Sequence, residues 1–484
     1  MNGFISDIQR FKNPAGFVVL LILSISTAFV IKSSGIKGGV LIFLAVIGPI
    51  IATAIIAFPK FGIIALMLFS VFINFILRMD LISFPLGTVL DGIQALLILG
   101  FFIKQKYTPD WSFLKTPVSL MIIVWITYNF LEIVNPSAES RMAWIYTIRG
   151  LAIVTLTYFI FSYHIRDIVF IRIIIKIILG ISLMGALYAY KQQFIGFSGF
   201  EEAYLYSDPQ IRDLLFIGGE WRKFSLFSDP VTFSYNMVLS SIICVGLMFG
   251  PISIGKKAIL GGLIFIYISA MLFSGTRSAY VLLPAALCLL AVLKLSKKTL
   301  IFAMVGGFFM AIVIFIPTSN MTLYRFQSAF KPSNDISYNV RANNQKFIQP
   351  YIRSHPMGGG LGSTGIWGAK FSPNSFLASF PPDSGYVRVA VEMGWIGLLI
   401  FCVLMFTILK TGIDNYFKMK DPELKSYCLG MLLIVFAFNI GNYPQEALVQ
   451  YPANIFFFLV VALINITYKL DKEKRNEESF LLKH

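Results

Sequence analysis

Long apolar runs separated by short polar connections recur along the whole 484-residue chain. A helix needs about 20 consecutive apolar residues to cross the hydrocarbon core of a bilayer, and these runs approach that length. Hydrophobic residues make up 57% of the chain and charged residues only 13%, more apolar surface than a soluble domain can bury. We therefore predict an all-α integral membrane protein, a single polytopic helical bundle over residues 1–484.

The apolar runs predict about fourteen membrane-spanning helices, with about twelve as the alternative because the first and last pairs are open to miscounting. They centre on residues 16–31, 38–57, 61–77, 88–103, 116–134, 144–163, 168–190, 231–249, 258–273, 278–295, 299–317, 386–409, 425–440 and 453–468. Two long connections, 191–230 and 317–385, join the seventh to the eighth and the eleventh to the twelfth of these segments. Function is expected in these connections and in the helix ends that support them.

The basic residues lie mainly at the ends of apolar runs, so the net charge of +16 reflects membrane topology and does not indicate nucleic-acid binding. Arg10 and Lys12 precede the first run, which we interpret as a retained signal anchor. The positive-inside rule then places both termini in the cytoplasm, with residues 469–484 as a cytoplasmic tail. Residues 191–230 and 317–385 become extracytoplasmic loops.

On this topology, the inside basic residues are mostly lysines and the outside ones mostly arginines. Topology requires only positive charge inside, so it does not explain arginine outside. The guanidinium is a planar fork that binds phosphate oxygens through two hydrogen bonds. The outer face is therefore predicted to bind a phosphate or diphosphate near the lipid head groups. In the alternative interpretation, these arginines reach toward head groups or pair with Asp and Glu.

The segment Leu272–Tyr280 joins two apolar runs with almost no loop and places Arg277 at the start of a helix at the outer boundary. Ser274, Gly275 and Thr276 can cap that helix and leave backbone N–H groups beside the guanidinium. This combination predicts an anion site, and an ordinary capped turn is the alternative.

The long 317–385 connection contains a predicted short helix that begins at Asp335 or Ser337 and ends at Pro350. Arg341 and Gln345 share one face of it by their i,i+4 spacing. The alternative is a surface helix with a solvated arginine. The glycine-rich run His355–Gly365 follows; its glycines permit close backbone approach to a ligand, but no strand precedes it, so it matches no nucleotide-binding loop.

Asp383 lies directly before the next apolar run, where it can either cap the helix or act as a base. A capping role would lower its pKa and weaken it as a base. Arg388 and Glu392 are four residues apart and can pair on one helix face.

The sequence contains no HExxH or GxSxG motif and no His, Asp or Glu cluster with metal-ligand spacing. Of its three histidines, only His355 falls outside on the predicted topology. We therefore expect neither a metal nor a cofactor.

These stretches, in this order, resemble the O-antigen ligase and polymerase family of bacterial membrane glycosyltransferases. The resemblance covers roughly residues 215–410 and begins with the Arg222–Pro230 stretch. It continues through Ser274–Ser278, Arg341, Pro356–Gly362 and Asp383–Leu398. The form with Asn374 and Pro382-Asp383-Ser384 resembles members from Bacteroidetes-type bacteria.

The resemblance implies a GT-C-like bundle in the bacterial inner membrane that transfers a glycan from undecaprenyl diphosphate on the extracytoplasmic side, without a metal. Arg277 and Arg341 match the family's essential arginines and would bind the departing diphosphate. Arg222 and Arg325, in the same outer segments, are added as further candidate diphosphate ligands. The family's ligases usually carry a His-Asn pair where this chain has Asp383-Ser384. Asp383 is therefore the expected base, with His355, or no strong base, as the alternatives.

The acceptor is left open among lipid A-core sugar, a growing glycan and a protein side chain. A polytopic transporter or flippase for lipid-linked glycans is the competing function, although the expected internal repeat is not evident. A peptidoglycan glycosyltransferase of the shape and elongation type is a third alternative.

Overall fold

The computed structural model describes residues 14–79, 87–217, 219–295, 321–330 and 336–481, together with scattered residues between 301 and 319. Within these residues, ten helices are long and apolar enough to cross a membrane, and Val46–Ala57 and Arg277–Leu293 are shorter apolar helices. The protein is thus a multi-pass, helical membrane protein. The apolar helices are α2 (Pro14–Ala57), α3 (Pro59–Arg78), α4 (Gly87–Tyr107), α5 (Pro117–Leu131), α6 (Arg141–Ile148), α7 (Val154–His164), α8 (Ile168–Phe194), α11 (Pro230–Met248), α12 (Ile254–Leu272), α13 (Arg277–Leu293), α19 (Gly394–Lys418), α20 (Pro422–Gly441) and α21 (Ala453–Leu481).

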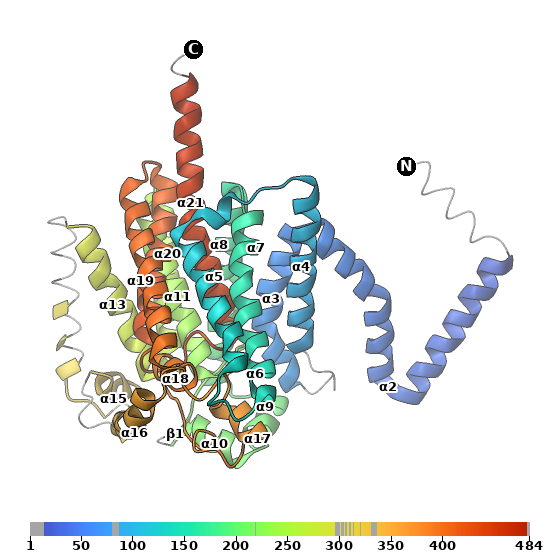
Figure 1. Ribbon diagram of the computed structural model, residues 1–484, viewed down its shortest axis with the longest axis horizontal. Coiled ribbons are helices and arrows are strands. Elements are labelled where there is room, and N and C mark those ends of the chain that lie inside the picture. Colours follow the sequence, from blue (N-terminus) through green and yellow to red (C-terminus); the bar gives the residue numbers. More distant parts are fainter. Residues whose placement is uncertain are drawn as a thin grey trace.

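Shorter elements gather at one end of the bundle, which we call the loop end, while the C-terminal end of α21 projects from the opposite end (Figure 1). The loop-end elements are α9 (Gly199–Leu205), α10 (Pro209–Leu215), β1 (Phe216–Ile217), β2 (Glu220–Trp221), α15 (Met321–Ser328), α16 (Ile336–Ser354), α17 (Gly365–Phe371) and α18 (Gly385–Glu392). The two strands form a small antiparallel hairpin. Further turns are the 3-10 helices η1 (Ser112–Lys115) and η2 (Glu132–Val134) and the π-helical turn η3 (Arg149–Ile153).

The predicted apolar segments fall on helices of the structure except 299–317, nine of whose nineteen residues lie outside the described residues. The total of fourteen spans therefore stays a prediction. Segment 386–409 is not one helix: α18 ends at Glu392 and α19 begins at Gly394. Gly394 has a φ of +68°, and a Cβ there would lie 1.9 Å from the carbonyl oxygen of Pro356. The chain can therefore turn at this point only because the residue is glycine.

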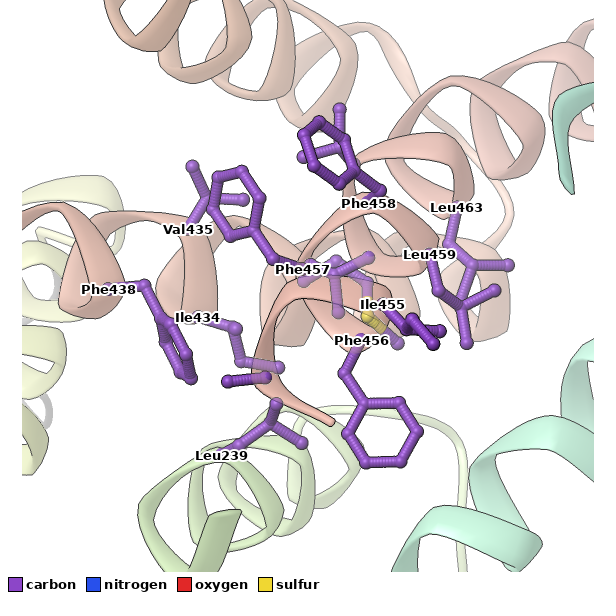
Figure 2. Close-up of a cluster of buried hydrophobic side chains, with 14 of the residues drawn as sticks. Leu239, Ile434, Val435, Phe438, Ile455, Phe456, Phe457, Phe458, Leu459 and Leu463 are labelled. Carbon is purple, nitrogen blue, oxygen red and sulfur yellow. The ribbon is translucent and has the colours of Figure 1, made fainter. Parts of the chain in front are cut away.

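The buried core lies where α11, α20 and α21 pack together (Figure 2). Leu239 of α11 faces Ile434 and Phe438 of α20, and the Phe456–Leu463 stretch of α21 completes the cluster. Gly246 and Gly430 lie at a crossing so close that a Cβ on Gly246 would be 2.6 Å from the Gly430 Cα. Small residues permit this approach of helix backbones, as is usual between membrane helices. The packed core thus supports the helix ends that carry the loop-end elements.

The helix predicted after Asp335 is present as α16, but it does not end at Pro350 and continues to Ser354. Asp335 itself lies outside the described residues. A small apolar cluster secures α16 on both sides of Pro350: Ile348 packs with Leu377, Phe380 and Val391, and Tyr351 and Ile352 pack against this cluster. This tertiary packing offsets the local cost of a proline inside the helix.

Candidate functional site: an arginine cluster and an Arg341–Asp383 pair

Arg222 is fixed at the loop end by carbonyl and hydroxyl oxygens. Its Nε donates to the Ser274 carbonyl at 2.9 Å, and its Nη2 donates to the Thr276 hydroxyl at 3.0 Å. A third donation reaches the Leu214 carbonyl at 3.3 Å. These bonds attach the chain that leads into α11 to the tight turn between α12 and α13.

Arg325 and Arg277 lie at the same turn. Gly275 has a φ of +61°, and a Cβ there would lie 3.0 Å from Arg325 Nη1. Arg325 also donates to the Ile217 carbonyl and is buried. Arg277 is the first residue of α13, and all three guanidinium groups are within electrostatic range of the Tyr280 hydroxyl. We call Arg222, Arg277 and Arg325 the arginine cluster.

The arginine cluster concentrates positive charge where water is partly excluded. Burial lowers the pKa of Arg222, and the neighbouring Arg325 and Arg277 lower it further. The Asp229 carboxylate opposes this shift, but it is engaged as the N-cap of α11, where it accepts from Val231 N at 2.8 Å. An anion placed among these guanidinium groups would relieve their mutual repulsion.

The predicted capping of α13 by the Thr276 side chain is wrong. Thr276 occupies the N-cap position but its side chain makes no capping bond. Its hydroxyl instead accepts from Arg222 and donates to the Pro230 carbonyl at 3.1 Å. The Ser274 hydroxyl accepts from Thr276 N at 3.1 Å and so closes the turn. Thr276 therefore orients an arginine and does not stabilise the helix end.

Asp383 lies across from Arg341, in the segment before α18. The two side chains interact electrostatically, Arg341 from α16 and Asp383 from a left-handed backbone position with a φ of +36°. The proposed capping role of Asp383 is wrong, because Ser384 is the N-cap and its side chain accepts from Val387 N. The pKa of Asp383 is accordingly raised and not lowered: removal of water raises it, and Arg341 only partly opposes this. A raised pKa makes a carboxylate a better proton acceptor.

Tyr235 of α11 lies near Arg341. Its hydroxyl donates to the Gly441 carbonyl at 2.9 Å and is within electrostatic range of Arg341. Helix α11 also packs against α13, whose first residue is Arg277. The structure thus gathers Arg222, Arg277 and Arg325 at one turn and sets Arg341 opposite Asp383 at the same end of the bundle.

His355 is at the far end of α16 from Arg341. The two positions are fourteen residues apart, which corresponds to about 20 Å along a helix axis. The His355 ring stacks on Tyr351 at 4.0 Å, and its Nδ1 lies 3.0 Å from the Tyr351 carbonyl oxygen. The His355 ring is therefore distant from Arg341, the electrostatic partner of Asp383.

Arg388, Glu392 and Glu446 form a second charged group, which we call the Arg388 network. The predicted Arg388–Glu392 pair is confirmed, with Nε and Oε1 3.1 Å apart. Arg388 Nη1 also contacts Glu446 Oε2 at 2.7 Å. Glu392 in turn accepts from Gly362 N at 3.0 Å and from the Thr364 hydroxyl at 2.5 Å. These bonds attach the glycine-rich run to α18.

The glycine-rich run packs closely against other segments of the protein. Gly359 N and Gly360 N donate to the carbonyls of Val391 and Glu392, each at 2.9 Å. A Cβ at Gly360 would lie 2.5 Å from the Ala138 Cβ, and one at Gly362 would lie 2.3 Å from the Thr147 hydroxyl. The close approach that we expected toward a ligand is therefore made to α6 and the segment before it.

Two residues that hold these groups in place, Arg78 and Glu446, were not predicted from the sequence. Arg78, at the end of α3, donates to the carbonyls of Ser225 and Phe227 and lies over the Phe224 ring at 4.3 Å, so it fixes the segment just after Arg222. Its place at the outer end of an apolar run was the available signal. Glu446 had no local signal, because its partner Arg388 is distant in sequence.

Residues 262–402 match the family model described as O-antigen ligase. A search among curated proteins found no match. Among the described residues, no group of three or more His, Cys, Asp or Glu side chains could hold a metal ion. The matched segment contains Arg277, Arg325, Arg341, Asp383 and the Arg388–Glu392 pair, whereas Arg222 lies before it. The match over residues 262–402 therefore supports assignment of the chain to the O-antigen ligase family.

Proposed function

We propose that the protein transfers a glycan from undecaprenyl diphosphate to an acceptor hydroxyl on the extracytoplasmic side of the bacterial inner membrane, without a metal. The family match supports a ligase- or polymerase-type glycosyltransferase in general terms. The observation that supports the finer proposal is the arginine cluster. In the described residues, Arg222 and Arg325 donate hydrogen bonds to carbonyl and hydroxyl oxygens, which leave their positive charge in place.

In the proposed reaction, the acceptor oxygen attacks the anomeric carbon of the donor while the bond from that carbon to the phosphate oxygen breaks. The diphosphate leaves with the bonding electrons, and the arginine cluster and Arg341 stabilise its growing negative charge. The acceptor proton passes to the Asp383 carboxylate, whose raised pKa suits it to receive a proton. Because diphosphate is a good leaving group, the arginines are expected to contribute more than the base.

Reconstitution of the full chain with an undecaprenyl-diphosphate glycan tests this proposal. Three reactions, each containing EDTA, would offer lipid A-core, a free glycan or a protein as acceptor, and mass spectrometry would detect the product. We expect transfer in one of them and its loss in Arg341→Ala. Arg353→Ala is the matched control, because Arg353 lies on the same helix and is exposed.

Absence of product in all three reactions, from protein that unfolds cooperatively on heating, would contradict the proposal. Movement of the intact donor across a vesicle bilayer under the same conditions would instead identify a transporter. The choice of acceptor follows directly from which reaction yields product.

A further inference from the structure

A cavity of 260 Å³ lies at the loop end of the bundle, beside the face of α18 that carries Gly385, Arg388 and Glu392. Its wall includes Gly385, two residues after Asp383. The cavity is lined by α4, α5, the α6–α7 span, α17, α18, α19 and the start of α21. Neither the arginine cluster nor Arg341 or Asp383 lines the cavity, whereas Arg388 and Glu392 of the Arg388 network do. The cavity is therefore separate from the proposed diphosphate site.

The cavity has an apolar floor and a polar rim. The floor is made by membrane-spanning helices and includes Trp125, Val154, Leu404 and Phe458. Most of its surface is therefore suited to a hydrocarbon chain, since burial of apolar surface is favourable roughly in proportion to the area removed from water. A sugar alone would leave this floor uncovered.

The rim carries charges that are already paired. Arg149 Nε lies 3.2 Å from Asp91 Oδ2, and Arg388 pairs with Glu392. The two arginines and two carboxylates that line the cavity therefore balance. A diphosphate would have to displace these carboxylates, whereas hydroxyl groups can hydrogen-bond to the pairs without breaking them.

The rim also presents aromatic rings. Tyr146 and Trp367 line the cavity with their ring centroids 4.7 Å apart, and Phe371 lies 5.1 Å from Tyr146. Amphipathic rings of this kind offer an apolar face and a hydrogen-bonding edge, which suits the C–H face and hydroxyls of a sugar ring. Trp367 and Phe371 come from α17, in the long connection before α18, and Tyr146 comes from α6.

The helix wall beside the rim is irregular. The span from Arg141 to His164 contains a π-helical turn, Arg149–Ile153, and Arg149, Gly150 and Leu151 of this turn line the cavity. Single π turns within α-helices are frequently found at functional sites. A Cβ added at Gly150 would have no neighbour within 4 Å, so the turn leaves open space there.

We propose that this cavity binds a neutral amphiphile, with its hydrocarbon chain on the apolar floor and a sugar-like, hydroxyl-rich head between the aromatic rings and the paired charges. This binding goes beyond the transfer reaction and does not depend on it. The head of the bound molecule would end near Gly385, beside the Asp383 segment.

Photo-labelling of the full chain in lipid nanodiscs tests the proposal. The probe is dodecyl glucoside with a diazirine in its chain; a dodecyl phosphate carrying the same diazirine tests the charge of the head. We expect the glucoside to label the α19 segment around Leu404 and the phosphate to label it several-fold less. Unlabelled dodecyl glucoside should compete with the label, and free glucose should not. Equal labelling by the two probes, or labelling only of lipid-facing positions, would overturn the proposal.

Gly150→Phe should fill the cavity and reduce glucoside labelling of α19 several-fold. Gly180→Phe is the matched control, because Gly180 is also an exposed helical glycine with no neighbour within 4 Å of an added Cβ, and it does not line the cavity. Unchanged labelling in a folded Gly150→Phe protein would overturn the proposal. Trp367→Ala provides a second test that leaves the floor intact, and we expect it to weaken glucoside labelling roughly threefold to tenfold. Full labelling in Trp367→Ala would contradict the proposed position of the head.

Discussion

The arginine cluster and the Arg388 network both place guanidinium groups at the loop end, but their partners differ. Arg222 and Arg325 donate to carbonyl oxygens and one threonine hydroxyl. Arg388 is instead held between two carboxylates, Glu392 and Glu446. Carbonyls and hydroxyls orient a guanidinium without cancelling its charge, whereas carboxylates cancel it. The first group is therefore suited to bind an anion, and the second is suited to hold the structure together.

The pKa shifts follow the same division. Removal of water and neighbouring arginines lower the pKa of Arg222, so its charged form lacks full compensation. Glu392 and Glu446 raise the pKa of Arg388 despite its burial. Arg222 would therefore be stabilised by an added anion, whereas Arg388 is already stabilised by the carboxylates of Glu392 and Glu446.

Arg388→Ala should have the largest effect and should act on folding. It would leave Glu392 and Glu446 without their cation, and removal of one partner of a buried pair costs about 3–5 kcal/mol. We expect a marked fall in the thermal unfolding temperature of the purified protein. Arg388→Met combined with Glu392→Gln should recover part of that loss. A stable but inactive Arg388→Ala protein would contradict the distinction between the two groups, because it would give Arg388 a role in the reaction.

Arg277→Ala should have its main effect on transfer. Loss of one group that stabilises a developing negative charge costs roughly 10²–10³ in rate. We expect a loss of this size in the reconstituted assay, with the unfolding temperature little changed. Arg277→Lys should recover only part of the activity, because lysine keeps the charge but lacks the planar fork. Normal transfer by Arg277→Ala would remove the arginine cluster from the proposed mechanism.

Asp383→Asn should reduce transfer by about 10², near the lower end for loss of a general base, because diphosphate leaves readily. Asparagine tolerates a left-handed backbone, so the fold should be retained. Since removal of water raises the pKa of Asp383, the folded protein disfavours its carboxylate. The variant should therefore unfold at the same or a higher temperature at neutral pH. Lower stability with intact transfer would mean that Asp383 is structural.

The wild-type pH profile sharpens this prediction. A base must be deprotonated, so transfer should fall on acidification through the Asp383 pKa, at a higher pH than an ordinary aspartate would give. A folded-state pKa that is raised means that this group favours folding more as the pH falls. Ser384→Ala is the control: it should cost about 1 kcal/mol of stability through loss of the α18 cap and leave the pH profile unchanged.

The membrane helices could be predicted from the sequence because their signal is local. An apolar run of sufficient length must cross the bilayer or be buried inside the protein. Nearly every predicted segment falls on a helix. The exceptions depended on distant contacts. The break at Gly394 follows from its contact with Pro356, and the continuation of α16 past Pro350 follows from packing against Leu377 and Phe380. Neither contact is visible in a window of sequence.

The candidate site shows the same limit. Arginine at the end of an apolar run was a sufficient signal to select Arg277, and i,i+4 spacing was sufficient to pair Arg388 with Glu392. The hydrogen-bond and ion-pair partners, which decide whether the charge of each arginine is neutralised, could not be predicted. Thr276 faces Arg222 and not its own helix, and Glu446 reaches Arg388 from the connection after α20. The roles of these residues in transfer stay predictions.

Thr276→Val should have the smallest effect. Valine keeps the shape of threonine but cannot accept the hydrogen bond from Arg222 or donate to the Pro230 carbonyl. Because the other two Arg222 bonds remain, we expect a roughly threefold to tenfold loss of transfer, as for one bond to a charged group. Thr407→Val is the matched control, since that hydroxyl bonds only to its own helix at Val403 in the described structure. If Thr276→Val lowered stability and not transfer, the oxygens around Arg222 would serve folding. The arginine cluster would then have a structural role, like the Arg388 network, although its hydrogen-bond partners are uncharged.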